Sequence, residues 1–123
     1  MVTIDLDSVE GIAIGIAHGP LNLEKICESA VAIWKHVKGP RIRILWDLRA
    51  ARFKLSTNDV RSLAEFIKQH SPPGDLRTAF VVSTVLEFGL VRMFEVLRET
   101  ASARTMVFRD KEQALEWLAS DAA

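Results

Sequence analysis

Residues 77–102 read RTAFVVSTVLEFGLVRMFEVLRETAS, and they carry the clearest indication of the fold. The segment begins with an apolar run at 79–82 that is too short for a helix and rich in β-branched and aromatic side chains, which predicts a strand buried on both faces. Thr84 and Glu87 follow at the spacing of a capping box, so a helix is expected from Thr84 to Ser102. A buried strand that leads directly into a helix is the repeating unit of an α/β fold.

The segments on either side continue this alternation of strands and helices. In chain order the predicted elements are a hairpin of strands at 2–7 and 12–18 ended by Gly19 and Pro20, a helix capped by Asn22, a strand at 41–47, a loop at 48–55, a helix capped by Ser56, the strand and helix described above, a strand at 104–108, and a helix capped by Asp110. The order β-β-α-β-α-β-α-β-α predicts a single α/β domain over residues 1–123. Its five-stranded sheet is expected to be mainly parallel, with the first strand antiparallel through the hairpin.

The composition favours a soluble cytoplasmic protein. The 16 basic and 16 acidic residues cancel, so there is no electrostatic reason to expect nucleic acid as a partner. The first residues lack the basic and apolar regions of a signal peptide, and no apolar run approaches the roughly 20 residues of a membrane span. Cys27 is the single cysteine, and the three histidines have no metal-ligand spacing, so neither a metal nor a cofactor is expected.

Several segments together resemble one known family. They are the N-terminal hairpin, the strand that ends in Asp47, AFVV at 79–82, FGLVRMFEVL at 88–97, VFRD at 107–110 and EQALEWL at 112–118. The pattern is similar to the SpoIIAA-like group of the STAS, or anti-sigma-factor-antagonist-like, fold, which also resembles the CRAL-TRIO lipid-carrier domains. This resemblance covers nearly the whole chain and implies a non-catalytic regulatory or protein-interaction module that forms a homodimer. The alternative function is a binding or carrier domain for a small apolar or amphiphilic ligand.

The resemblance also implies a phosphorylation site. In anti-sigma-factor antagonists a phosphorylatable Ser lies where the second helix begins, and Ser56 or Thr57 is the nearest equivalent here. Those proteins place an Asp directly beside the Ser, whereas residues 48–55 separate Asp47 from Ser56 in this chain. Ser56 also fits a plain N-cap, because Asp59 follows at capping-box spacing.

Two features predict a ligand site. In the second strand Ala13, Gly15 and Ala17 share one face, and such small side chains indicate that a packed helix or a ligand approaches the sheet closely there. Polar side chains are expected at the carboxyl ends of the parallel strands, where ligands of α/β proteins usually bind. The candidate ligand-binding residues are Ala13, Gly15, Ala17, Asp47, Arg49 and Ser83.

A basic sector runs from Lys38 to Lys54 and is opposed within it only by Asp47. Its members are Lys38, Arg41, Arg43, Arg49, Arg52 and Lys54. Three explanations of this sector stay open. It is a solvated surface, a site for an anionic headgroup, or a surface whose charge complements that of a second subunit.

The helix expected from Thr84 carries a candidate interface. Its turn of about 100° per residue places Phe88 and Val91 among charged side chains, opposite the expected buried face. Exposed apolar side chains on a helix indicate contact with a second copy or a protein partner, unless a loop covers them. The candidate interface residues are Phe88, Val91, Arg92 and Glu95.

The sequence gives little support to catalysis. His18, Asp47 and Ser83 are expected at one edge of the sheet and would serve a small hydrolase, with His18 as the base and Asp47 as its orienter. However, Ser83 lies in VVSTV rather than in a G-x-S-x-G elbow, and the chain has neither a phosphate loop nor a dinucleotide-binding motif. We therefore expect no enzyme activity and no catalytic residue.

Overall fold

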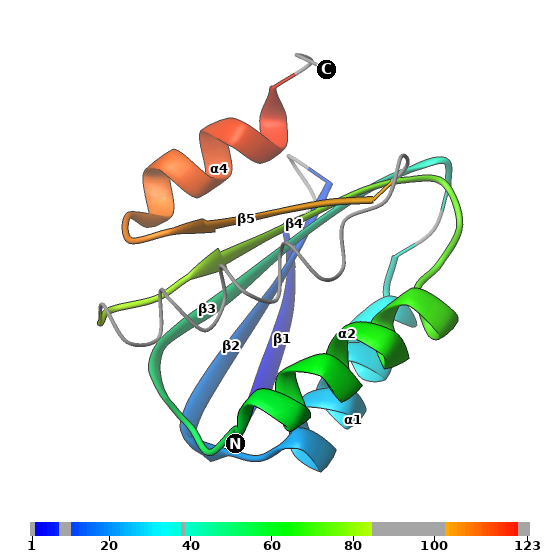
Figure 1. Ribbon diagram of the computed structural model, residues 1–123. Coiled ribbons are helices and arrows are strands. Elements are labelled where there is room, and N and C mark those ends of the chain that lie inside the picture. Colours follow the sequence, from blue (N-terminus) through cyan, green and yellow to red (C-terminus); the bar gives the residue numbers. More distant parts are fainter. Residues whose placement is uncertain (1, 8–10, 38, 85–102, 121–123) are drawn as a thin grey trace.

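Five strands form one sheet in the computed structural model, which describes residues 2–7, 11–37, 39–84 and 103–120 (Figure 1). In the sheet they keep their chain order: β1 (Val2–Asp7), β2 (Ile12–Leu21), β3 (Arg41–Phe53), β4 (Asp75–Val81) and β5 (Ala103–Phe108). β1 pairs antiparallel with β2, and all later neighbours pair in parallel. An α/β class with a mainly parallel sheet is therefore confirmed.

Helices lie on both faces of the sheet. Figure 1 shows α1 (Leu23–Trp34) and α2 (Thr57–His70) on one face and α4 (Lys111–Ala119) on the other. The central strands are accordingly buried on both sides, since Ile44 and Trp46 of β3 pack on the α1 face while Leu45 packs beneath α4. In β4, Ala79 and Val81 are fully buried, as the apolar run at 79–82 predicts.

Each described helix begins at its predicted cap. The side chain of Asn22 accepts a hydrogen bond from the Lys25 amide at 2.9 Å, and that of Asp110 accepts from the Glu112 amide at 2.9 Å. Ser56 and Asp59 form the expected reciprocal capping box, with distances of 3.1 and 3.0 Å. These caps satisfy amides that a helix leaves unpaired in its first turn, which is why local sequence locates the helix starts well.

Two strands are longer than the sequence predicts. The expected end of β2 at His18 and the expected loop at 48–55 are both wrong, because residues 18–21 of β2 pair with residues 50–53 of β3 after an irregularity between Ile16 and His18. Pro20 is tolerated there because the β1 partner ends at the pair Val2–Ala17, and no described residue pairs with that edge of β2 beyond it. Gly19 supplies a φ of 74° that few other residues adopt. We call residues 18–21 and 50–53 the β2–β3 extension.

The expected helix over Thr84 to Ser102 falls almost entirely on residues outside the described ones. The candidate interface residues Phe88, Val91, Arg92 and Glu95 lie in this part of the chain. The role of these four residues as an interface therefore stays a prediction.

Candidate ligand-binding site

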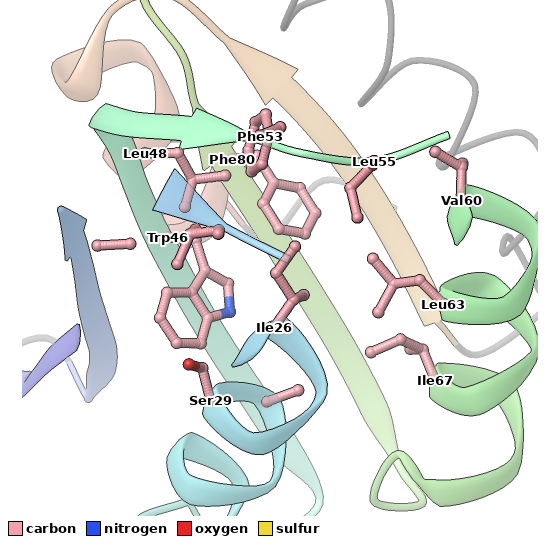
Figure 2. A pocket seen from close by; sticks show the side chains of 13 residues that line it. Ile26, Ser29, Trp46, Leu48, Phe53, Leu55, Val60, Leu63, Ile67 and Phe80 are labelled. Atoms are coloured by element: carbon pink, nitrogen blue, oxygen red, sulfur yellow. The ribbon is translucent and has the colours of Figure 1, made fainter. Parts of the chain in front are cut away.

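An apolar cavity of about 90 Å³ lies between the sheet and helices α1 and α2 (Figure 2). Among the described residues that line it, Ser29 is the only one with a hydroxyl group, and none carries a charge. The lining comprises Ala17, Leu21, Ile26, Ser29, Ala30, Trp46, Leu48, Phe53, Leu55, Val60, Leu63, Ile67 and Phe80. Concave sites with a largely apolar lining are the usual binding places for small molecules.

The β2–β3 extension provides one wall of the cavity. Leu21 and Phe53 face it from the paired ends of β2 and β3, where they are register partners. A backbone hydrogen bond of 2.8 Å from the Lys54 amide to the Leu21 carbonyl continues this pairing and brings Leu55 to the same wall. The alternation of Ala51, Phe53 and Leu55 with exposed residues was the sequence signal for this strand, and the loop prediction missed it.

The two helices provide the opposite wall. Ile26 and Ala30 are four residues apart on α1 and therefore lie on one face of that helix. Val60, Leu63 and Ile67 follow the same rule on α2, and the sequence correctly predicts them as its inner face. The amphipathic stripes of both helices thus serve the core and the cavity together.

Trp46 forms part of the floor of the cavity and explains the small residues of β2. Gly15 is its register partner on the neighbouring strand, and a Cβ atom at Gly15 would overlap the six-membered ring of the indole. The close approach predicted from Ala13, Gly15 and Ala17 is therefore made at Gly15 by the Trp46 ring. Ala17 lines the cavity itself.

The predicted polar ligand residues lie elsewhere. The carboxylate of Asp47 accepts hydrogen bonds from Arg49 Nη2 at 2.7 Å and Nε at 2.9 Å, near the middle of β3, where its pairing with β4 ends. These bonds hold the pKa of Asp47 below its usual range. Ser83 Oγ donates to the Arg49 carbonyl and the Ser83 carbonyl accepts from Arg109, each at 3.3 Å. Of the six candidate ligand-binding residues, the structure places only Ala17 in the cavity lining.

The basic sector divides between the two ends of β3. Arg43 and Arg52 are nine positions apart, a span of about 30 Å along a strand. Arg41 and Arg43 reach the C-terminal end of α4, whereas Arg49 pairs with Asp47 farther along the strand. Lys38 lies outside the described residues. The sector is therefore not one continuous surface.

Two buried arginines hold the end of α4, a role that the sequence did not reveal. Arg43 Nε donates to the Leu118 carbonyl at 3.2 Å, and Arg77 Nη1 donates to the carbonyls of Trp117 and Ser120 at 3.1 and 3.0 Å. Burial, with the charge of Arg43 adding to it, lowers the pKa of Arg77. Cations at a helix C-terminus are favourable because the last carbonyls carry partial negative charge.

The remaining chemical candidates are separate from the cavity lining. Ser56 is exposed in its capping box, and His18 is exposed on the β2–β3 extension. Cys27 is half-buried beside the α1–α2 contact, where burial raises the pKa of its thiol. No group of three or more His, Cys, Asp or Glu residues able to hold a metal occurs in the described part of the chain. Nor is any helix within it long and apolar enough to cross a membrane.

The sequence matches no family model and no curated protein. Among solved structures the fold is similar to that of an uncharacterised protein of the DUF3478 family, with a SpoIIAA-like fold, from Shewanella loihica PV-4. The TM-score is 0.62 at 21% identity, and the match covers 96% of this chain and 92% of that chain. The predicted SpoIIAA-like fold is thereby confirmed. At this identity the likeness concerns the fold and leaves the activity open.

Proposed function

We propose that the chain is a non-catalytic binding module that takes a small apolar ligand into the cavity between the sheet and helices α1 and α2. The observation that carries this function is the cavity itself, about 90 Å³ with no charged residue among the described residues that line it. One water requires about 10–15 Å³ on this measure, so the cavity accommodates roughly six to nine non-hydrogen atoms. That size suits a small ring or a short branched chain rather than a whole lipid.

The expected affinity follows from the apolar surface that such a ligand loses. Each buried CH₂ group contributes about 0.8 kcal/mol, so a seven-carbon hydrocarbon gains about 5–6 kcal/mol and binds with a Kd on the order of 0.1 mM. A charged headgroup would find no opposite charge on the lining residues that the structure describes. The proposed ligand is therefore apolar throughout most of its volume.

The test is a titration of ¹⁵N-labelled protein with methylenecyclohexane, followed by amide chemical shifts. Amides of α1, α2 and the β2–β3 extension should shift and saturate, while those of α4 on the opposite face should stay in place. Ala30→Leu should abolish the shifts because Ala30 is buried and lines the cavity, and Val31→Leu is the matched control because Val31 is exposed. Saturating shifts that persist in Ala30→Leu, or no shifts in the unmodified chain, would contradict the proposal.

A second function is supported by the fold. The SpoIIAA-like likeness over 96% of the chain favours a regulatory, protein-interaction module of the anti-sigma-factor-antagonist type. In this form the chain would be a homodimer that uses the predicted residues Phe88, Val91, Arg92 and Glu95. Sedimentation should show a dimer that Phe88→Glu converts to a monomer, with Val31→Glu as the control on an exposed valine of α1. An unchanged mass for Phe88→Glu would argue against self-association through this segment.

Phosphorylation at Ser56 would connect the two functions. Ser56 is exposed and caps α2, the helix that provides Val60, Leu63 and Ile67 to the cavity. The Asp59 carboxylate accepts a hydrogen bond from the Ser56 amide. A phosphate on Ser56 would repel this carboxylate, because the two groups carry like charge. The check is mass spectrometry of the Ser56 peptide after incubation with cell lysate and ATP. No mass gain would speak against the site.

A further inference from the structure

The cavity contains one hydrogen-bond donor that its surroundings do not use. Trp46 lines the cavity and is 8% exposed. Its indole N–H makes no hydrogen bond to any residue in the described part of the chain, and it is not among the fully buried unpaired atoms there. In Figure 2 the indole nitrogen lies on the edge of the ring that faces Ile26 of α1, among the lining side chains. A Trp N–H beside an apolar cavity usually pairs with an acceptor when a molecule fills that cavity, so an acceptor from a bound molecule is the natural partner here.

The other polar group of the lining is already engaged. Ser29 Oγ donates to the Lys25 carbonyl at 2.7 Å, one turn back on α1, so its proton is not offered to a ligand. No charged side chain belongs to the lining in the described part of the chain, and a carboxylate or ammonium group would have no counter-ion among those residues. Among the described lining residues, the one side-chain donor without a partner therefore calls for a neutral acceptor.

We infer that the ligand is a neutral, hydrocarbon-like molecule with one carbonyl oxygen, as in a small ketone or ester, which accepts the Trp46 indole N–H. A carbonyl brings no donor of its own and therefore leaves no unpaired proton in an apolar site. Because this ligand class rests on the proposed binding function, its test must separate the preference for a carbonyl from binding as such.

Two probes of one shape provide that separation. Cyclohexanone and methylenecyclohexane share a six-membered ring and differ in an exocyclic oxygen or CH₂ group. In ¹⁵N spectra the Trp46 indole proton, assigned by its loss in Trp46→Phe, should move downfield with the ketone and much less with the hydrocarbon. The indole of Trp117, which packs on Phe108 beneath α4, is the internal control.

The affinities give a second readout. Trp46→Phe removes the N–H and keeps an aromatic ring, so the ratio of ketone to hydrocarbon affinity should fall about fivefold, the value of one ordinary hydrogen bond. Comparing the ratio cancels the packing change, which affects both probes. If both probes shift the cavity amides but the indole proton responds equally to each, the carbonyl preference is overturned while the binding function stands. If neither probe binds, both proposals fail.

Discussion

The contact of Gly15 with Trp46 shows how one residue pair shapes the candidate site. The indole lies on the α1 face of the sheet because its register partner has no side chain. Gly15 has no positive φ, so its backbone would accept alanine, and only the ring above it forbids a Cβ atom. Gly15 is thus required for space and not for conformation.

Gly15→Ala should therefore destabilise the fold by about 1–3 kcal/mol, the usual cost of overpacking a core. Urea denaturation measures the change. In a Trp46→Ala background the same substitution should cost nothing, and restriction of the unfolded chain should make it stabilising by about 0.4–1 kcal/mol. An equal cost in both backgrounds would show that the ring is not the cause.

The ion pair of Asp47 with Arg49 predicts how the stability of the fold changes with pH. Arg49 favours the ionised carboxyl, so the folded-state pKa of Asp47 lies below its unfolded value of about 4. The stability that Asp47 contributes is complete above that unfolded pKa and is lost as pH falls through the lower folded pKa. Asp47→Asn should cost about 1–2 kcal/mol at pH 7, with the half-exposed Arg49 limiting the effect. In urea denaturation the difference from the unmodified protein should shrink below about pH 4, and a constant difference down to pH 2 would refute the lowered pKa.

At the scale of elements, α4 depends on arginines from strands that are distant in the sequence. Arg43, Arg77 and Arg104 occupy matching register positions on β3, β4 and β5. Arg43 and Arg77 are buried beneath the end of α4, whereas Arg104 is exposed. The same residue type at one register therefore has two different roles.

This difference provides a matched pair of variants. Arg43→Met should destabilise the protein by about 2 kcal/mol, because it leaves the Leu118 carbonyl without its charged donor. It should also speed hydrogen exchange of the α4 amides. Arg104→Met should change both measurements little. Equal effects of the two variants would mean that the contacts of Arg43 with α4 are not what holds the helix.

For the molecule as a whole, binding in the cavity should stabilise the complete fold, because the cavity is formed jointly by β2, β3, β4, α1 and α2. Methylenecyclohexane at ten times its Kd should raise the free energy of unfolding by about 1.4 kcal/mol. A thermal melt of the unmodified protein measures this as a higher Tm. Ala30→Leu should show no rise, and a similar rise in that variant would place binding elsewhere.

Much of the fold was predictable because its signals are local. The caps Asn22, Ser56 and Asp110 locate helix starts, since a cap and the amide it satisfies are within three residues. The apolar run at 79–82 predicts a buried strand because burial on both faces requires consecutive apolar residues. Helix faces such as the Val60 to Ile67 stripe follow from the helical period.

The candidate site was less predictable because it depends on register between distant segments. Local sequence was enough to predict the alternation of strands and helices, the buried faces and the helix caps, because all of these depend on neighbouring residues. Tertiary structure alone decided that Gly15 lies beside Trp46, that the β2–β3 extension closes one wall of the cavity, and that Arg43 reaches the end of α4. Such contacts arise from strand pairing and helix docking, which bring together residues far apart in the chain and leave no periodic mark in the sequence.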